Sequence, residues 1–264
     1  MKLNQIEYQL FQKLIFDEIG ISLDNNKINL VQSRLYARML HHKIKSFSHY
    51  LQIVTDDHKE KIQMINLITT NETYFFREDQ HFEFLYNITK QIKINQEFRV
   101  WSAASSVGAE AYSIAMILDN YLTRSQWEVV GTDINTDVIE KAKKGLYSES
   151  WIEKIPAKYR TKYCLKGRGR FEGKFIIDRS LIKNVHFSTN NLTISNKSLG
   201  NFDIIFLRNV LLYFNQLTKQ QVLDNILDNL KMGGYFIISL TENLDELDTS
   251  RLEKVKSSIY KRIG

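Results

Sequence analysis

The chain has 264 residues, and 36 Lys and Arg residues against 30 Asp and Glu residues leave a formal net charge of +6. Hydrophobic residues make up 43% of the sequence and charged residues 25%, a mixture that excludes a mainly disordered chain. The charge bias is too mild to indicate an obligate nucleic-acid binder, and no apolar run reaches the ~18 residues that would span a bilayer. The single cysteine, Cys164, excludes an internal disulfide, and the six histidines do not fall at metal-ligand spacing. We therefore expect a cytoplasmic protein without a metal.

The N-terminal part of the chain, residues 1–70, is predicted to be helical. Apolar residues recur there at spacings of three and four, as on one face of a helix. Gly20 is expected to end the first helix. Three apolar residues of a later helix are expected to face a core: Leu35, Met39 and Leu40.

The pattern changes after residue 97, where short apolar runs begin to alternate with helical segments. Such alternation predicts a parallel sheet with crossover helices. Residues 71–97 are expected to link the helical domain to this α/β domain at 98–264. The expected strands are residues 98–101, 127–130, 202–207 and 235–238, the last entered by a turn at Gly233-Gly234, with a final edge strand at 255–262; the expected helices are residues 110–122 and 137–144.

One segment, residues 154–177, does not fit the alternation. It is rich in Lys, Arg and Gly and contains Glu172 as its one acid after Lys154. Gly-rich turns between short apolar runs predict a small antiparallel hairpin, inserted on the surface at about residues 150–178. A solvated loop is the alternative interpretation of such a charge run.

A candidate nucleoside site lies at the end of the first predicted strand. The loop Ala103–Gly108 consists of small residues and leads into a helix, so the backbone can approach a ligand closely. Asp133 ends the next strand, where a carboxylate commonly accepts hydrogen bonds from two ribose hydroxyls. The loop lacks the full G-x-G-x-x-G pattern that a dinucleotide pyrophosphate requires. This favours S-adenosylmethionine over NAD as the ligand.

Three segments raise the specificity of this prediction: Asn71 to Arg77 (NETYFFR), Trp101 to Ala115 (WSAASSVGAEAYSIA) and Phe206 to Phe214 (FLRNVLLYF). In this order and spacing they resemble the chemotaxis receptor methyltransferase family, CheR. Shorter stretches agree with the resemblance, namely residues 131–135, 191–192 and 231–234. The resemblance implies an all-helical N-terminal domain, then a Rossmann-like S-adenosylmethionine-dependent methyltransferase domain with a small antiparallel β-subdomain.

The resemblance also implies roles for individual residues. Arg77 and Tyr213 are implied to act in catalysis, Arg77 as a clamp on the substrate carboxylate and Tyr213 as an orienting hydroxyl. Cofactor contacts are implied for Asn71, Thr73, Arg77, Glu110, Asp133, Asn191, Leu192, Arg208 and Asn209. The chain departs from the family pattern at Val107–Ala111, where an acid, a proline and a threonine are replaced by apolar residues.

The implied reaction is methyl transfer to glutamate side chains of a chemoreceptor. An independent feature suits an acidic helical substrate: no acid occurs between Asn25 and Thr55, and five basic residues recur there at helical spacing. On an α-helix they form one stripe that could dock the substrate: Lys27, Arg34, Arg38, His41 and Lys45. A solvated helix face is the alternative interpretation of this stripe.

Alternatives to this function stay open at this point. They are a methyltransferase of a different protein substrate, a regulatory module that binds S-adenosylmethionine or its demethylated product S-adenosylhomocysteine (SAH) without turnover, and a nucleic-acid methyltransferase. The last is the weakest, because no aromatic-plus-proline catalytic loop is visible. We expect a monomer, and a receptor C-terminal peptide could add to the β-subdomain as an edge strand.

Overall fold

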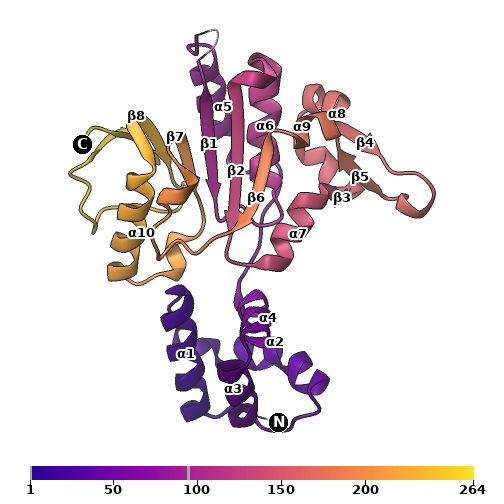
Figure 1. Ribbon diagram of the computed structural model, residues 1–264, viewed down its shortest axis with the longest axis vertical. Helices are drawn as coiled ribbons and strands as arrows, with labels where there is room; N and C mark the ends of the chain where they lie inside the picture. Colours follow the sequence, from indigo (N-terminus) through magenta and orange to yellow (C-terminus); the bar gives the residue numbers. More distant parts are fainter. Residues whose placement is uncertain (1, 94–95) are drawn as a thin grey trace.

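The computed structural model describes residues 2–93 and 96–264. It contains an N-terminal helical domain and a larger α/β domain. The helical domain lies below the α/β domain in Figure 1. Asn4 and Glu7 form a reciprocal capping box at the first helix, and Gly20 ends it in the left-handed conformation, as expected. The helical domain comprises α1 (Gln5–Ile19), the 3₁₀ turn η1 (Asn25–Lys27), α2 (Ile28–His41), α3 (Phe47–Asp56) and α4 (His58–Ile68).

The helical domain has its own core, built from one apolar face of each helix. Tyr8, Phe11 and Leu35 are fully buried in it. Leu40, which was predicted to face this core, is instead 54% exposed. The helix turns by 100° per residue, so Leu40 lies beside its buried neighbour Met39 in sequence but not on the same face.

Within the described residues, the α/β domain is built on a seven-stranded sheet of order β6-β2-β1-β7-β8-β10-β9. The first five strands run parallel, and β10 and β9 are antiparallel. The order reverses beside β1, which creates a crevice at the carboxyl ends of β1 and β7. The strands are β1 (Phe98–Ala103), β2 (Trp127–Asp133), β6 (Val185–Thr189), β7 (Phe202–Leu207), β8 (Leu230–Ile237), β9 (Leu252–Lys256) and β10 (Ile259–Arg262).

Helices cover both faces of the sheet, because successive strand residues point to opposite sides. Val100 and Ile204 pack in the core beneath α5 and α6, whereas Trp101 and Ile205 pack against α10. The helices of this domain are α5 (Asp79–Thr89), α6 (Ala109–Tyr121), α7 (Thr136–Lys144), α8 (Ala157–Tyr163), α9 (Arg179–Ile182) and α10 (Gln216–Asp228), with 3₁₀ turns η2 (Arg124–Gln126), η3 (Glu149–Lys154), η4 (Gly169–Phe171), η5 (Lys197–Leu199) and η6 (Leu211–Tyr213).

Two predictions near the C-terminus were wrong. Gly233-Gly234 does not precede a strand but lies inside β8, where the pairing with β7 shifts register and Gly233 takes a φ of 75°. Residues 231–234 have no partner in the β7 register, and glycine permits the positive φ where the chain leaves the ladder. The segment at residues 255–262 is not one edge strand either. It contributes to the hairpin β9–β10, in which β10 pairs with β8 and β9 forms the edge.

The basic insertion forms the antiparallel subdomain on one side of the molecule (Figure 1). Its sheet has the order β3-β5-β4, with β3 (Leu146–Ser148), β4 (Cys164–Lys166) and β5 (Lys174–Ile177). The first of these strands begins before the predicted boundary at about residue 150. Within the described ranges, no helix is long and apolar enough to cross a membrane.

Candidate active site

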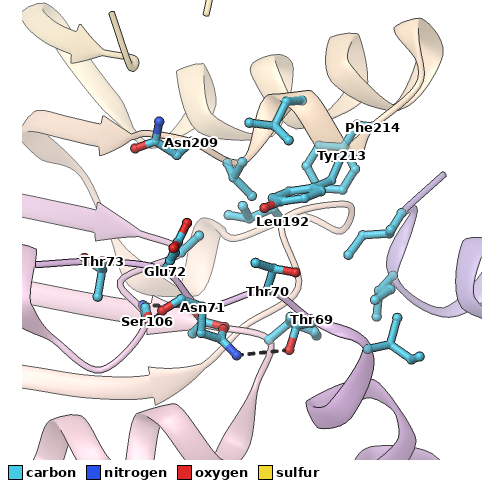
Figure 2. A pocket seen from close by; sticks show the side chains of 18 of the residues that line it. Thr69, Thr70, Asn71, Glu72, Thr73, Ser106, Leu192, Asn209, Tyr213 and Phe214 are labelled. Atoms are coloured by element: carbon cyan, nitrogen blue, oxygen red, sulfur yellow. Dashed lines mark hydrogen bonds between the residues drawn. The ribbon is translucent and has the colours of Figure 1, made fainter. Parts of the chain in front are cut away.

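A cavity of about 340 Å³ lies where the carboxyl ends of the parallel strands meet the helical domain. Its walls come from the loops after β1, β2, β6 and β7, from the segment at residues 68–77, and from the end of α1. Figure 2 shows this arrangement, with Tyr213 and Leu192 facing Asn71 and Thr73 across the cavity. The position is the one at which open α/β sheets bind ligands.

The helical domain is held against the sheet by contacts around the cavity. The Asn66 side chain exchanges two hydrogen bonds with Thr136, at 2.8 and 3.0 Å, and so fixes the end of α4 to the start of α7. The Asn191 amide donates to the carbonyl of Glu18 at 2.9 Å. Ile21 pairs with the backbone of Phe214, next to the predicted catalytic tyrosine. Both domains therefore build one site.

Every residue assigned from sequence to catalysis or cofactor binding lines this cavity. These residues come from distant parts of the chain: Asn71, Thr73, Arg77, Glu110, Asp133, Asn191, Leu192, Arg208, Asn209 and Tyr213. Their convergence is a geometric finding, and their individual roles remain predictions.

The loop after β1 has a strained backbone that brings it close to the cavity. Ala104 and Ser106 have φ angles of 59° and 50°, and Gly108 one of 87°. The Ser106 hydroxyl donates to the carbonyl of Asn71 at 3.0 Å, which ties this loop to the segment that carries Arg77. Positive φ in residues other than glycine persists only where surrounding contacts hold it.

Asp133 lies buried at the end of β2, beside the loop. One carboxylate oxygen accepts the Ser106 N–H at 2.8 Å and the other accepts the Asn135 N–H at 2.9 Å. Burial raises the pKa of Asp133, and these backbone donors oppose that rise without cancelling it. Each oxygen of an ionised carboxylate has two lone pairs, so both retain capacity for a ligand hydroxyl.

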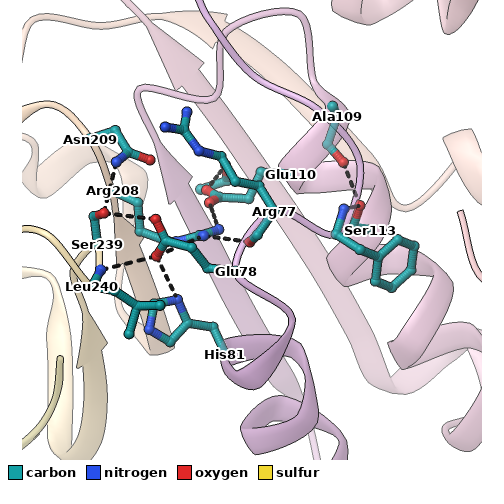
Figure 3. A network of polar contacts seen from close by, with 12 residues as sticks. Arg77, Glu78, His81, Ala109, Glu110, Ser113, Arg208, Asn209, Ser239 and Leu240 are labelled. Atoms are coloured by element: carbon teal, nitrogen blue, oxygen red, sulfur yellow. Dashed lines mark hydrogen bonds and ion pairs between the residues drawn. The ribbon is translucent and has the colours of Figure 1, made fainter. Parts of the chain in front are cut away.

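A buried ion network lies behind the cavity wall (Figure 3). Arg208 is only 3% exposed in its side chain and bonds to Glu110 at 2.8 Å and to Glu78 at 3.1 Å. The same guanidinium donates to the backbone carbonyl of Arg77. The other Glu110 oxygen accepts from Ser102 at 2.7 Å. Arg208 therefore fixes the backbone of the predicted clamp residue.

Glu78, which sequence reasoning missed, orders this network. It takes a φ of 59° directly after Arg77, and its carboxylate also accepts from the Ser239 hydroxyl at 2.8 Å and the Leu240 N–H at 3.0 Å. Burial alone would raise the pKa of Glu78, but Arg208 and these donors together hold the pKa below its ordinary value. Burial and the nearby Arg208 charge lower the pKa of His81 to about 4, so this histidine is neutral at physiological pH.

A second missed acid, Glu242, fixes the loop after β7. Its carboxylate accepts the N–H groups of Asn209 and Leu211, each at 2.9 Å, and that of Ser239 at 3.1 Å. Asn209 takes a φ of 58°, and its side chain donates to Ser239 at 2.7 Å. Sequence reasoning missed Glu78 and Glu242 because most of their partners are more than 30 residues away or in backbone groups; His81, three residues after Glu78, is the nearby exception.

Arg77 and Tyr213 each present a polar group to the cavity that is available to a ligand. Over residues 2–93 and 96–264, Arg77 forms no ion pair; its guanidinium donates to the Glu72 carbonyl at 3.0 Å. The hydroxyl of Tyr213 points into the cavity in Figure 2, and no hydrogen bond to it is found in the same ranges. These two groups are placed to receive a ligand.

Comparison with known proteins shows the family to which the chain belongs. Residues 6–69 match the "CheR methyltransferase, all-alpha domain" and residues 71–261 match the "CheR methyltransferase, SAM binding domain". The chain belongs to the CheR family. It is 35% identical to the chemotaxis protein methyltransferase of Escherichia coli (strain K12), over 94% of this chain and 88% of that protein. It is 34% identical to the corresponding protein of Vibrio parahaemolyticus, over 97% and 96% of the two chains.

The polar groups that line the cavity of this CheR protein fit S-adenosylmethionine. Small polar residues line it, among them Ser105, Ser106 and Asn190. Asp133 adds an acceptor for hydroxyl groups. In the described ranges, no cluster of three potential metal ligands occurs.

The departure from the family pattern at Val107–Ala111 affects residues that pack in the core. Glu110 lines the cavity, whereas Ala109 and Ala111 are fully buried in the core. The carbonyl of Val107 accepts from the Tyr147 hydroxyl at 2.7 Å. The changes therefore leave the cavity-facing acid of this CheR protein in place.

The predicted basic stripe does not exist as a single helix face. Lys27 lies in η1 and Lys45 beyond the end of α2. Arg34 donates to the Thr69 carbonyl and the Thr70 hydroxyl, at 3.2 and 3.1 Å, and Arg38 pairs with buried Glu60. Of the stripe residues (Lys27, Arg34, Arg38, His41 and Lys45), Lys27 lines the cavity. The partly buried side chains of Arg34 and Arg38 join α2 to the segment after α4 and to α4 itself.

Proposed function

We propose that this protein transfers a methyl group from S-adenosylmethionine to glutamate side chains in the cytoplasmic helices of a chemoreceptor. One observation carries the proposal: the unpaired guanidinium of Arg77 and the hydroxyl of Tyr213 face the same cavity as Asp133. The names of the relatives in Escherichia coli and Vibrio parahaemolyticus support the chemotaxis setting.

Cofactor binding is assigned to the loops after β1, β2 and β6. Asp133 would accept the ribose hydroxyls, and Leu192, which is 7% exposed, would form an apolar wall for the base. The Asn191 side chain is bonded to Glu18 and Thr193, so we assign its contribution to the backbone. When bound, S-adenosylmethionine supplies a methyl group made electrophilic by the sulfonium.

Arg77 and Tyr213 would act on the substrate carboxylate. A glutamate has an ordinary pKa of about 4.3 and is ionised at neutral pH, so no general base is required. The guanidinium of Arg77 can hold a carboxylate through two parallel hydrogen bonds. The carboxylate loses its negative charge as the ester forms, so Arg77 contributes chiefly through orientation. Correct orientation of reacting groups can supply ~7–11 kcal/mol of a barrier.

Glu110, Arg208 and Glu78 are assigned a supporting role in this reaction. Both oxygens of Glu110 are already bonded, to Ser102 and to Arg208. Arg208 in turn donates to the Arg77 carbonyl. The network therefore holds the clamp residue at the cavity wall, and the negative charge of Glu110 favours a cationic ligand nearby.

The test is transfer of tritiated methyl from S-adenosylmethionine to a purified receptor cytoplasmic fragment. We expect label that mild base releases as methanol, because a carboxyl methyl ester is base-labile. Replacing the labelled glutamates by alanine should abolish it. Binding of SAH without any base-labile transfer would contradict the proposal and favour the regulatory module. Base-stable label would indicate a different acceptor chemistry.

A further inference from the structure

An exposed aromatic ring at the cavity lies within contact distance of two cations. Tyr74 is 41% exposed and lines the cavity. The Arg77 guanidinium carbon is 5.7 Å from the centre of its ring, and the Lys154 ammonium nitrogen is 5.5 Å from it. Lys154 belongs to η3, at the base of the β-subdomain. This ring therefore connects the predicted clamp to a charge contributed by a separate part of the chain.

Among the described residues, no carboxylate neutralises the charge of Lys154. No carboxylate in the described part of the chain forms an ion pair with Lys154 or with Arg77, although Glu72 lies at the same rim of the cavity. Other lysines of the subdomain do have such partners, for example Lys166 with Glu149 at 2.9 Å. An exposed, unpaired ammonium beside the clamp is available to an anionic group of the substrate.

The separation of the two cations has an upper limit that a helical substrate can be compared with. The Arg77 carbon and the Lys154 nitrogen cannot lie further apart than the sum of their distances to the ring centre, 11.2 Å. An α-helix rises 1.5 Å per residue, so side chains four or seven residues apart are displaced by about 6 or 10.5 Å. The limit of 11.2 Å therefore admits Lys154 as the partner of an acid one or two turns away from a glutamate held by Arg77.

We propose that Tyr74 and Lys154 form a second anionic subsite, which favours receptor glutamates that have another acidic residue one or two helical turns away. The inference rests on the proposed function, because it assigns substrate selection to that same site. Tyr74 supports the ammonium through its ring face, and Lys154 supplies the charge that the neighbouring acid binds. Lys154 is a specificity-determining residue and makes no contact with the reacting carboxylate.

The experiment uses two helical peptides that contain the same central glutamate. They differ only in having Glu or Gln at the positions four and seven residues to either side. Binding to the SAH complex and methyl transfer are measured for the wild type, for Lys154→Gln and for Lys158→Gln. Lys158 is the matched control, because its nitrogen lies 4.6 Å from the ring of Tyr159, whereas that of Lys154 lies 5.5 Å from the ring of Tyr74.

We expect Lys154→Gln to raise the Kd and KM for the acidic peptide about two- to fivefold, the size of one partly exposed charge pair, without changing kcat. The neutral peptide should bind both proteins equally, and Lys158→Gln should behave as wild type. Equal losses for both peptides, or equal losses in both variants, would overturn the subsite. Selective binding without transfer to either peptide would count against the proposed function and leave the subsite standing.

Discussion

Arg208 offers the sharpest stability prediction, since it is the shared partner of two largely buried carboxylates. Glu78 and Glu110 are 13% and 12% exposed in their side chains, and Arg208 is 3% exposed. At an effective dielectric constant of about 20, one pair of unit charges about 4 Å apart attracts by ~4 kcal/mol. Desolvation of the arginine offsets part of this gain. Removing one member of such a buried network typically costs about 3–5 kcal/mol.

We therefore expect Arg208→Met to lower the free energy of unfolding by about 3–5 kcal/mol, a large part of the ~5–15 kcal/mol of a typical domain. Urea unfolding at neutral pH measures this change. The control is Arg124→Met, because Arg124 is 56% exposed and its partner Asp119 retains its contacts with Lys162 and Tyr163 in this variant. This substitution should lower the free energy of unfolding by less than about 1 kcal/mol.

The double variant Arg208→Met/Glu78→Gln separates charge from packing. It removes one of the two buried charges that Arg208→Met leaves unpaired, so it should be more stable than the single variant. An Arg208→Met protein within 1 kcal/mol of wild type would refute the reasoning. A double variant less stable than the single one would show that packing, and not the unpaired carboxylates, causes the loss.

Two further predictions concern other carboxylates. Asp133→Asn should weaken SAH binding roughly 10- to 150-fold in calorimetry, since a hydrogen bond to a charged group contributes about 1.5–3 kcal/mol; an unchanged Kd would contradict the ribose assignment. For Glu60, burial raises the pKa, but hydrogen bonds from Arg38, Tyr50 and His42 lower it to about 2. Its stabilisation is therefore complete above pH ~4.3 and is lost as the pH falls towards 2. Glu60→Gln should flatten this acid dependence in urea unfolding, and an unchanged slope would exclude Glu60 as its cause.

Of the five parallel strands in the described part of the chain, four could be predicted because their signals are local, whereas β6 was not predicted. Apolar runs such as Phe202–Leu207 coincide with the strand in the structure. Asp133 and Tyr213 follow strand ends, and the carboxyl ends of parallel strands meet at one edge of the sheet. The family motifs added residues such as Arg77, whose segment no periodicity would have placed in the cavity.

The errors share a physical cause, which is that sequence spacing does not reveal tertiary partners. Arg38 was predicted to face a substrate, but in the structure it binds Glu60, a buried residue of α4. Glu78 was overlooked because its partner Arg208 is 130 residues away. Gly233 was interpreted as a turn because glycine permits positive φ inside a strand as well as in a turn.

The central claim is that Arg77 orients the substrate carboxylate in a cavity that binds the cofactor independently. The most direct test compares Arg77→Ala with wild type in two measurements, methyl transfer to a receptor cytoplasmic fragment and SAH binding. Misplacement of a reacting group by about 1 Å can cost on the order of 100-fold in rate. We predict a loss of that order in kcat/KM, with the SAH Kd within about threefold of wild type, since Asp133 and the loop after β1 are untouched. Near-normal transfer by Arg77→Ala would contradict the account.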